Sequence, residues 1–207
     1  MAENTAVALG REAARRLVAV HGRETTIGPG LTEAEFARIE NEYGFEFAAD
    51  HRAFLAAGLP RSRPATSTPE VIHTWREPWP DWRDDDPAVL RGRLDGPIEG
   101  VLFDVEHNST WYDGWGPRPE QAAERLAKAR QELATVPKLV PVYGHRFLPA
   151  GSGSFGHPVL SVRQTDIIYY GKDLADYVYR EFRDSHFESP DQSWQPSATV
   201  PFWRDFL

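Results

Sequence analysis

The segment LTEAEFARIENEYGFEFAADHRAFLAAG, residues 31–58, carries the clearest structural signals in the chain. Thr32 and Glu35 have the spacing of a capping box, in which each side chain bonds the backbone N–H of the other at a helix start. Apolar residues then recur at three- and four-residue spacing as far as Tyr43. Gly44 follows at the position where helices commonly end in a left-handed glycine. The segment therefore predicts one well-defined amphipathic helix.

A second, short helix is expected directly after the first. Asp50 can cap its N-terminus, Phe54 contributes to its apolar side, and Gly58 can end it. Upstream, residues 5–21 can form a helix with Ala, Leu and Val along one side, and residues 22–30 read as a polar connection. The first third of the chain is therefore predicted to be helical.

The rest of the chain predicts strands with one helix between them and another after them. The expected elements are a loop over 59–67, a short helix from Thr68-Pro69 to Trp75, a helix start at Asp86-Pro87, a strand over 100–106, a helix over 119–135, strands over 138–143, 158–163 and 166–170, and a helix from Asp173 to Phe182. This order indicates a mixed α+β fold with a mainly antiparallel sheet.

We expect a single domain, because no linker is rich enough in Pro, Gly or Ser to divide the 207 residues. Residues 1–30 would form an N-terminal helical extension, and residues 31–183 the α+β body. The tail, 184–207, is polar but contains Trp194, Phe202, Trp203 and Phe206, whose rings we expect to pack back on the body instead of facing water.

Charge and composition narrow the possible functions. The chain has 31 Asp or Glu against 23 Lys or Arg, and this acidic balance disfavours direct binding of DNA or RNA. It would attract a basic protein partner, although the same charge also serves solubility. Cysteine is absent, which excludes disulfides, thiol nucleophiles and Cys-based zinc sites. The first twenty residues contain Arg11, Arg15 and Arg16, so we expect a cytoplasmic protein without a signal peptide or membrane span.

Two patterns resemble catalytic or cofactor motifs. Residues 151–156, GSGSFG, match G-x-G-x-x-G, but Pro158 and an apolar run follow instead of a helix, so we predict a hairpin loop. A nucleophile site could combine Ser152 or Ser154 with His157 and Asp166. The G-x-S-x-G turn that would position such a serine is absent, and we predict no catalytic residue.

Two parts of the sequence contain His, Asp or Glu residues that could suggest a metal site. Asp104, Glu106 and His107 lie together, but successive strand residues point to opposite faces, so Glu106 and His107 would be separated if the predicted strand continued to His107. A metal- or ligand-binding enzyme that uses His107 with His145 and His157 stays a weaker alternative. The aspartates that follow Trp79 lack the spacing of an EF-hand loop. We therefore predict no metal and no cofactor.

Two groups of aromatic and acidic residues are the candidates for binding a protein partner, since large rings and complementary charge are the usual anchors of such surfaces. Trp111 and Trp115 could alternatively plug one end of the core. The predicted partner-binding residues are Trp79, Trp82, Asp84, Asp85, Asp86, Glu106, His107, Trp111, Asp113 and Trp115.

The segment 31–58 resembles the opening helices of the SUKH superfamily, the Smi/Knr-like group of cell-wall regulators and bacterial immunity proteins. LVPVYGHRFLP (139–149) and HPVLSVRQTDIIYYGKDLADYVYREF (157–182) are similar to its later strands and final helix. The family usually has a proline where this chain has Ala48. The resemblance implies a curved antiparallel sheet flanked by helices over residues 31–183.

The resemblance also implies a function without catalysis. Many bacterial members are immunity proteins that bind and neutralise toxins, often nucleases or deaminases, and fungal relatives are regulatory scaffolds. We therefore expect a protein-binding module, with an immunity protein against a basic toxin as the first reading. A regulatory scaffold with a non-toxic partner is the alternative.

Overall fold

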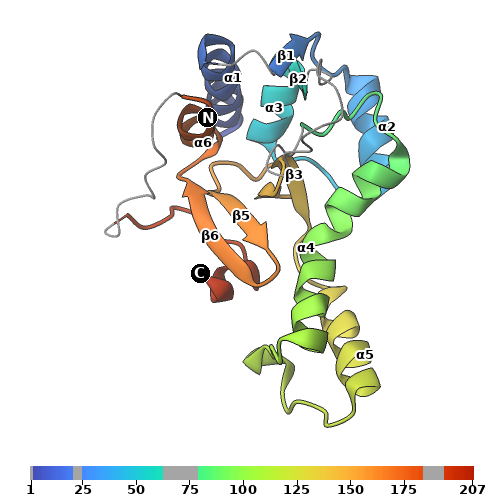
Figure 1. Ribbon diagram of the computed structural model, residues 1–207. Helices are drawn as coiled ribbons and strands as arrows, with labels where there is room; N and C mark the ends of the chain where they lie inside the picture. The colour runs from blue at the N-terminus through green and yellow to red at the C-terminus, as the bar shows by residue number, and fades with distance from the viewer. Residues whose placement is uncertain (1, 21–24, 63–78, 184–193) are drawn as a thin grey trace, which may run out of the picture.

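The computed structural model describes residues 2–20, 25–62, 79–183 and 194–207, which form one domain (Figure 1). The predicted α+β class is confirmed, and every strand pairing among these residues is antiparallel. The elements, in chain order, are α1 (Ala2–Val20), β1 (Thr25–Gly28), α2 (Glu33–Tyr43), α3 (Ala49–Ala57), β2 (Leu59–Ser62), α4 (Pro87–His107), η1 (Asp113–Trp115), α5 (Ala122–Leu133), β3 (Leu139–Tyr143), β4 (Arg146–Pro149), β5 (Val159–Arg163), β6 (Asp166–Gly171), α6 (Leu174–Phe182) and η2 (Trp203–Phe206).

Helix α2 begins with the predicted capping box. Thr32 accepts the N–H of Glu35 through its hydroxyl, and the Glu35 carboxylate accepts the N–H of Thr32. Arg83 donates to the same carboxylate, and together with the bonds from Thr32 it lowers the pKa of Glu35 to about 2. Gly44 closes the helix in the left-handed conformation, at φ 64°. The capping residues thus also tie the acidic turn before α4 to α2.

Helix α3 starts differently from the prediction. Its N-cap is Ala48, which makes no side-chain cap, and Asp50 lies inside the first turn with its side chain buried. The Asp50 carboxylate accepts hydrogen bonds from the N–H of His51 and of Gly156. The prediction of an Asp50 cap is therefore wrong, because this carboxylate is used to hold a distant loop.

Helix α1 packs on α3 and α6 and buries Ala6, Ala13 and Leu17 against them. The two helices approach each other closely at Gly10, where a Cβ atom would lie 2.2 Å from the carbonyl oxygen of Asp50 in α3. Glycine is required there because any side chain would push the two helices apart. The N-terminal extension is therefore built into the core.

Two antiparallel sheets are present among the described residues. Strands β3, β4, β5 and β6 form a four-stranded meander in that order, and β1 pairs with β2. Strands β1, β2 and β4 were not predicted, and the loop expected over 59–67 starts as strand β2. Each of the three has four residues, which is too short for a clear alternating pattern. The short helix expected from Thr68 to Trp75 lies outside the described residues.

The strand predicted over 100–106 is the clearest error, because these residues form the C-terminal end of α4. Val101, Leu102 and Val105 are buried on one side of the helix, and Phe103 is 46% exposed on the other. A short run of apolar residues fits a strand or a buried helix equally well. The expected start at Asp86-Pro87 is correct, since Asp86 accepts the N–H of Ala88.

The middle of α4 contains residues that weaken a helix. Pro97 lies inside the helix, where it removes a backbone donor, and Gly92, Gly96 and Gly100 flank it. Beyond this stretch α4 packs on α5, and the two helices extend away from α1, α2 and α3 (Figure 1). We call residues 95–134 the arm.

The hydrophobic core consists of two clusters. One lies between α1, α2, α3, α6 and the sheet, and the other joins the arm, the other side of the sheet and the chain's last residues. Trp203 in η2 is fully buried in the second cluster and donates its indole N–H to the Pro137 carbonyl at 2.7 Å. The tail from residue 194 onward therefore contributes to the core.

Candidate functional site

The predicted partner-binding residues fall at opposite ends of α4. Trp79 to Asp86 precede the helix, and Glu106 to Trp115 lie at its end and in the connection beyond it. With a rise of about 1.5 Å per residue, the twenty-one residues of α4 separate the two groups by roughly 30 Å. The ten residues therefore do not form a single surface.

Trp79 and Trp82 are core residues. Trp82 is 1% exposed, with its ring among Tyr43, Phe45 and Phe47. Trp79 is similarly buried and stacks on Phe182. The prediction that these two rings contact a partner is therefore wrong, because rings this fully enclosed cannot reach a partner while the domain is folded.

The aspartates around them organise a turn. Asp81 accepts the N–H groups of Arg83 and Asp84, and the carboxylate of Asp85 accepts the N–H of Asp81. Arg61 of β2 pairs with Asp81 at 3.0 Å and Asp84 at 2.7 Å. Asp84 still exposes most of its side chain, but the group as a whole stabilises the entry to α4.

At the far end of α4, Glu106 and His107 are exposed on the helix surface. The ring of His107 lies 4.5 Å from that of Phe103, and its Nε2 atom is 3.5 Å from the carboxylate of Glu106. Phe103 had no role in the sequence prediction, because the helical periodicity that places it outside was not recognised. The three side chains form a small apolar and ionisable patch on the arm.

The connection after α4 is fastened by aromatic contacts. Trp115 is buried and stacks on Phe202, and Tyr112 also contacts Phe202. Trp111 is half-buried, lies 5.2 Å from Trp115, and donates its indole N–H to the Gly116 carbonyl. Of the two interpretations left open, the plug describes Trp115, whereas Trp111 keeps part of its ring at the surface.

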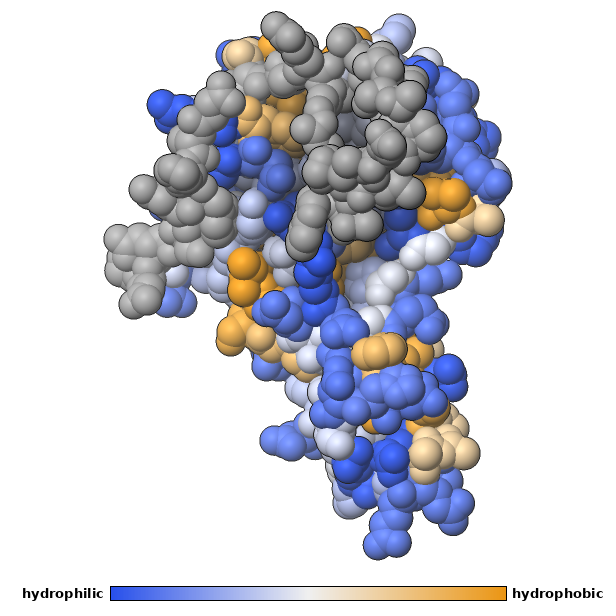
Figure 2. Space-filling view, viewed as in Figure 1, coloured by the Kyte–Doolittle hydropathy of each residue, from blue (hydrophilic) through white to orange (hydrophobic). Residues whose placement is uncertain are grey.

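The arm is more acidic than the average of the chain. It has eight Asp or Glu, of which Asp104 is buried, against four Lys or Arg. Figure 2 shows hydrophilic residues over most of this part, with isolated hydrophobic patches. Asp113 is exposed in η1 beside Trp111. Glu106, His107, Trp111 and Asp113 thus share the arm with exposed Phe103.

The Gly-rich loop 151–156 joins β4 to β5 and is hydrogen-bonded to the start of α3. Ala49 donates its N–H to the Ser154 carbonyl at 2.8 Å, and the Gly156 N–H donates to Asp50. Ser154 donates its hydroxyl to the Gly151 carbonyl at 2.8 Å. A strand follows the loop, as the hairpin interpretation predicted, and no helix N-terminus follows it.

The three histidines considered as a ligand site are attached to different elements. His107 ends α4, and His145 lies in the β3–β4 turn within 3.3 Å of Arg163. His157 precedes β5, and burial lowers its pKa. Across the described ranges, no cluster of three His, Asp or Glu residues is placed to hold a metal ion. Within the same ranges, no helix combines the length and the apolar character that crossing a membrane requires.

No protein-family model matches the chain, and neither a curated protein nor a solved structure matches it.

Proposed function

We propose that this chain is a non-catalytic protein-binding module that contacts its partner through the arm. The observation that supports this proposal is the set of exposed side chains Phe103, Glu106, His107 and Asp113, together with the half-buried ring of Trp111, on the arm. Exposed aromatic rings are frequent energetic anchors of protein interfaces. They are most effective when their position is fixed before binding, and here Trp115 and the tail fasten the connection beneath Trp111.

The partner that suits this surface is a protein with a basic face. The acidic excess of the arm would raise the association rate with such a face, and burial of Phe103 and Trp111 would slow dissociation. We propose an immunity protein that covers and thereby neutralises a basic toxin. The resemblance of residues 31–58 and 139–182 to the SUKH superfamily supports this role, since binding without catalysis is what that family implies.

The experiment begins with a tagged pull-down from the native host, with mass spectrometry and native sizing. The captured protein is then expressed alone and together with this chain, and growth is measured. Toxicity alone, with stoichiometric rescue by the chain, is the expected result. A stable partner that is harmless alone would replace the immunity role with that of a regulatory scaffold.

Variants test whether the arm is the binding surface. Phe103→Ala and His107→Ala should each leave the fold intact, because both side chains are exposed on a helix. Phe103→Ala should weaken binding at least tenfold, as expected for an interface anchor. Val89→Ala is the matched control, since Val89 is exposed near the other end of α4. Equal affinity of all three variants and the parent would remove the arm from the interface.

A further inference from the structure

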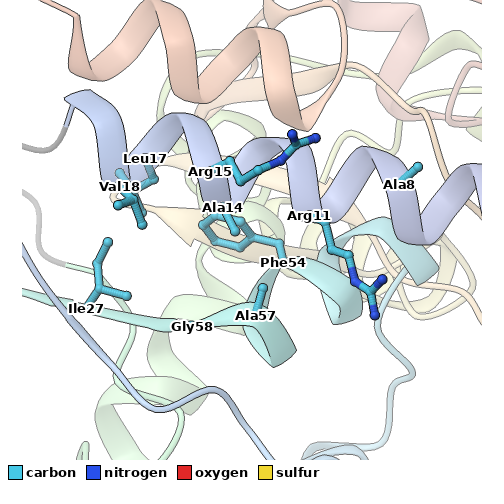
Figure 3. A pocket seen from close by; sticks show the side chains of 10 residues that line it. All are labelled: Ala8, Arg11, Ala14, Arg15, Leu17, Val18, Ile27, Phe54, Ala57 and Gly58. Carbon is cyan, nitrogen blue, oxygen red and sulfur yellow. The ribbon is translucent and has the colours of Figure 1, made fainter.

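A groove of about 600 Å³ lies between α1, α3 and β1, in a part of the molecule that the proposed function does not use (Figure 3). Its described lining consists of Ala8, Arg11, Ala14, Arg15, Leu17, Val18, Ile27, Phe54, Ala57 and Gly58. From Ala8 to Val18 it follows α1 for about 15 Å, at about 1.5 Å per residue.

Small residues account for the groove. Gly10 brings α1 into contact with α3, and Ala14 and Ala57 leave the space beside that contact open. Phe54 lies in the floor, where its ring packs on that of Trp79, and Ile27 closes one end (Figure 3). The floor is therefore rigid, because it belongs to the hydrophobic core.

The lining combines apolar surface with positive charge. Val18 is 56% exposed and adds apolar surface to the groove. Arg11 and Arg15 both extend from α1, with their guanidinium groups pointing in different directions (Figure 3), and no carboxylate belongs to the described lining. Arg15 pairs with Glu12 at 2.6 Å, whereas no carboxylate in the described ranges pairs with Arg11. In a chain of net charge −8, these two arginines form a local positive site that would attract an anion.

We propose that the groove binds an anionic amphiphile, with one linear apolar chain and a single carboxylate or phosphate head group. The apolar chain would cover Ala14, Val18 and Phe54, and the head group would bind Arg11 and Arg15. From Arg11 to Val18 the groove follows α1 for about 10 Å, which suits a chain of about eight to ten carbons at an advance of about 1.2 Å per bond. The volume lies within the range of about 300–1,000 Å³ that small-ligand pockets occupy.

Calorimetry with decanoate, octanoate and decanol, each below its aggregation concentration, tests the proposal. Decanoate should bind at least threefold more tightly than decanol, because the alcohol lacks the charge. Octanoate should bind about four- to fifteenfold more weakly than decanoate, since each buried methylene contributes about 0.8 kcal/mol at most. Equal binding of decanoate and decanol would overturn the assignment of the arginines. Absence of decanoate binding at millimolar concentration would overturn the site.

Two variants locate the ligand. The double variant Arg11→Gln, Arg15→Gln should lose about three- to tenfold in decanoate affinity, as for two exposed ion pairs, and leave decanol binding unchanged. Arg118→Gln, an exposed arginine on the arm, is the control for net charge. Ala57→Trp should abolish binding of both ligands by filling the groove, with circular dichroism as the check on folding.

Nuclear Overhauser effects from the decanoate chain to Phe54 and Val18 would place the ligand directly. Contacts confined to other residues would contradict the proposal. A dodecyl phosphate probe that binds as decanoate does, with the same loss in the double variant, would assign the shared anionic chemistry to both head groups. The groove lies outside the arm, so failure of these measurements would leave the proposed partner surface unaffected.

Discussion

Asp104 on α4 accepts two hydrogen bonds from Thr165 in the β5–β6 turn, one from its backbone N–H at 2.9 Å and one from its hydroxyl at 2.6 Å. Asn108 donates to the other carboxylate oxygen. Burial raises the pKa of Asp104, but the bonds from Thr165 and Asn108 outweigh burial and lower it below its ordinary value. Gly100 allows the close approach, since a Cβ there would lie 2.9 Å from Gln164.

Replacement of this carboxylate should destabilise the domain. Asp104→Ala leaves the Thr165 N–H without its acceptor in a part-buried position, which costs about 2–3 kcal/mol. Urea denaturation measures the change in unfolding free energy, with exposed Glu106→Ala as the neutral neighbour. Because the folded pKa is lowered, the contribution of Asp104 is present above the ordinary Asp pKa of about 3.9 and is lost as pH falls below it. A difference of less than about 0.5 kcal/mol between the two variants would contradict this role.

Acid should destabilise the fold through His51, which is 1% exposed. Burial lowers its pKa to about 3, whereas an unfolded histidine titrates near pH ~6.5. Below that pH the unfolded state binds a proton that the folded state does not, so stability falls by about 1.4 kcal/mol per pH unit. The dependence of unfolding free energy on pH, measured for the parent and for His51→Leu between about pH 7 and 5, isolates the effect. Other titrating groups, such as Asp50, whose pKa burial raises, are present in both proteins and cancel in the comparison. Parallel profiles would show that the pKa of His51 is the same in the folded and unfolded states.

Two glycines in helices should respond oppositely to the same substitution. Gly10→Ala places a methyl group against the backbone of Asp50 and Phe54, and should cost about 2 kcal/mol despite the better helix propensity of alanine. A Cβ atom added at Gly92 of α4 would meet no neighbouring atom within 4 Å, so Gly92→Ala should gain up to about 1 kcal/mol. Thermal unfolding measures both. A stabilised Gly10→Ala variant would mean that α1 and α3 are not in close contact.

The end of the chain should be as important for stability as a core helix. Trp203→Ala removes a fully buried ring together with its hydrogen bond to Pro137, and should cost about 3–5 kcal/mol. Leu207→Ala, four residues on and 45% exposed, should change stability by less than about 0.5 kcal/mol. Similar melting temperatures for the two variants would show that the tail does not belong to the core.

Local signals were sufficient for the helices that begin with their own caps. Thr32 with Glu35, and Asp86, act through bonds to residues two or three positions away, so their spacing alone carries the information. The Asp50 cap failed because the partner of that carboxylate, Gly156, is more than a hundred residues distant. The pairing of β1 with β2 was missed for the same reason, since the two strands lie thirty or more positions apart.

The residue types of the candidate site could be predicted from the sequence, but which of these side chains are exposed could not. Trp79 and Trp82 look like Trp111 in the sequence, and only their distant neighbours, such as Phe182 and Phe47, enclose them. Phe103 could have been recognised if the apolar run around it had been read with helical periodicity after the Asp86 cap. The amphiphile groove depends on Gly10 at a helix crossing, which carries no distinct signal in one sequence.

The three glycines and the proline in the middle of α4 also decide how the molecule carries load. Gly92, Gly96, Pro97 and Gly100 weaken the helix in its middle, so by itself this stretch would be a softer joint between the body and anything held at its far end. The carboxylate of Asp104 lies just beyond that joint and clamps it to the β5–β6 turn. Force applied at the arm would therefore pass into the sheet through this clamp as well as through the buried side chains of the second core cluster.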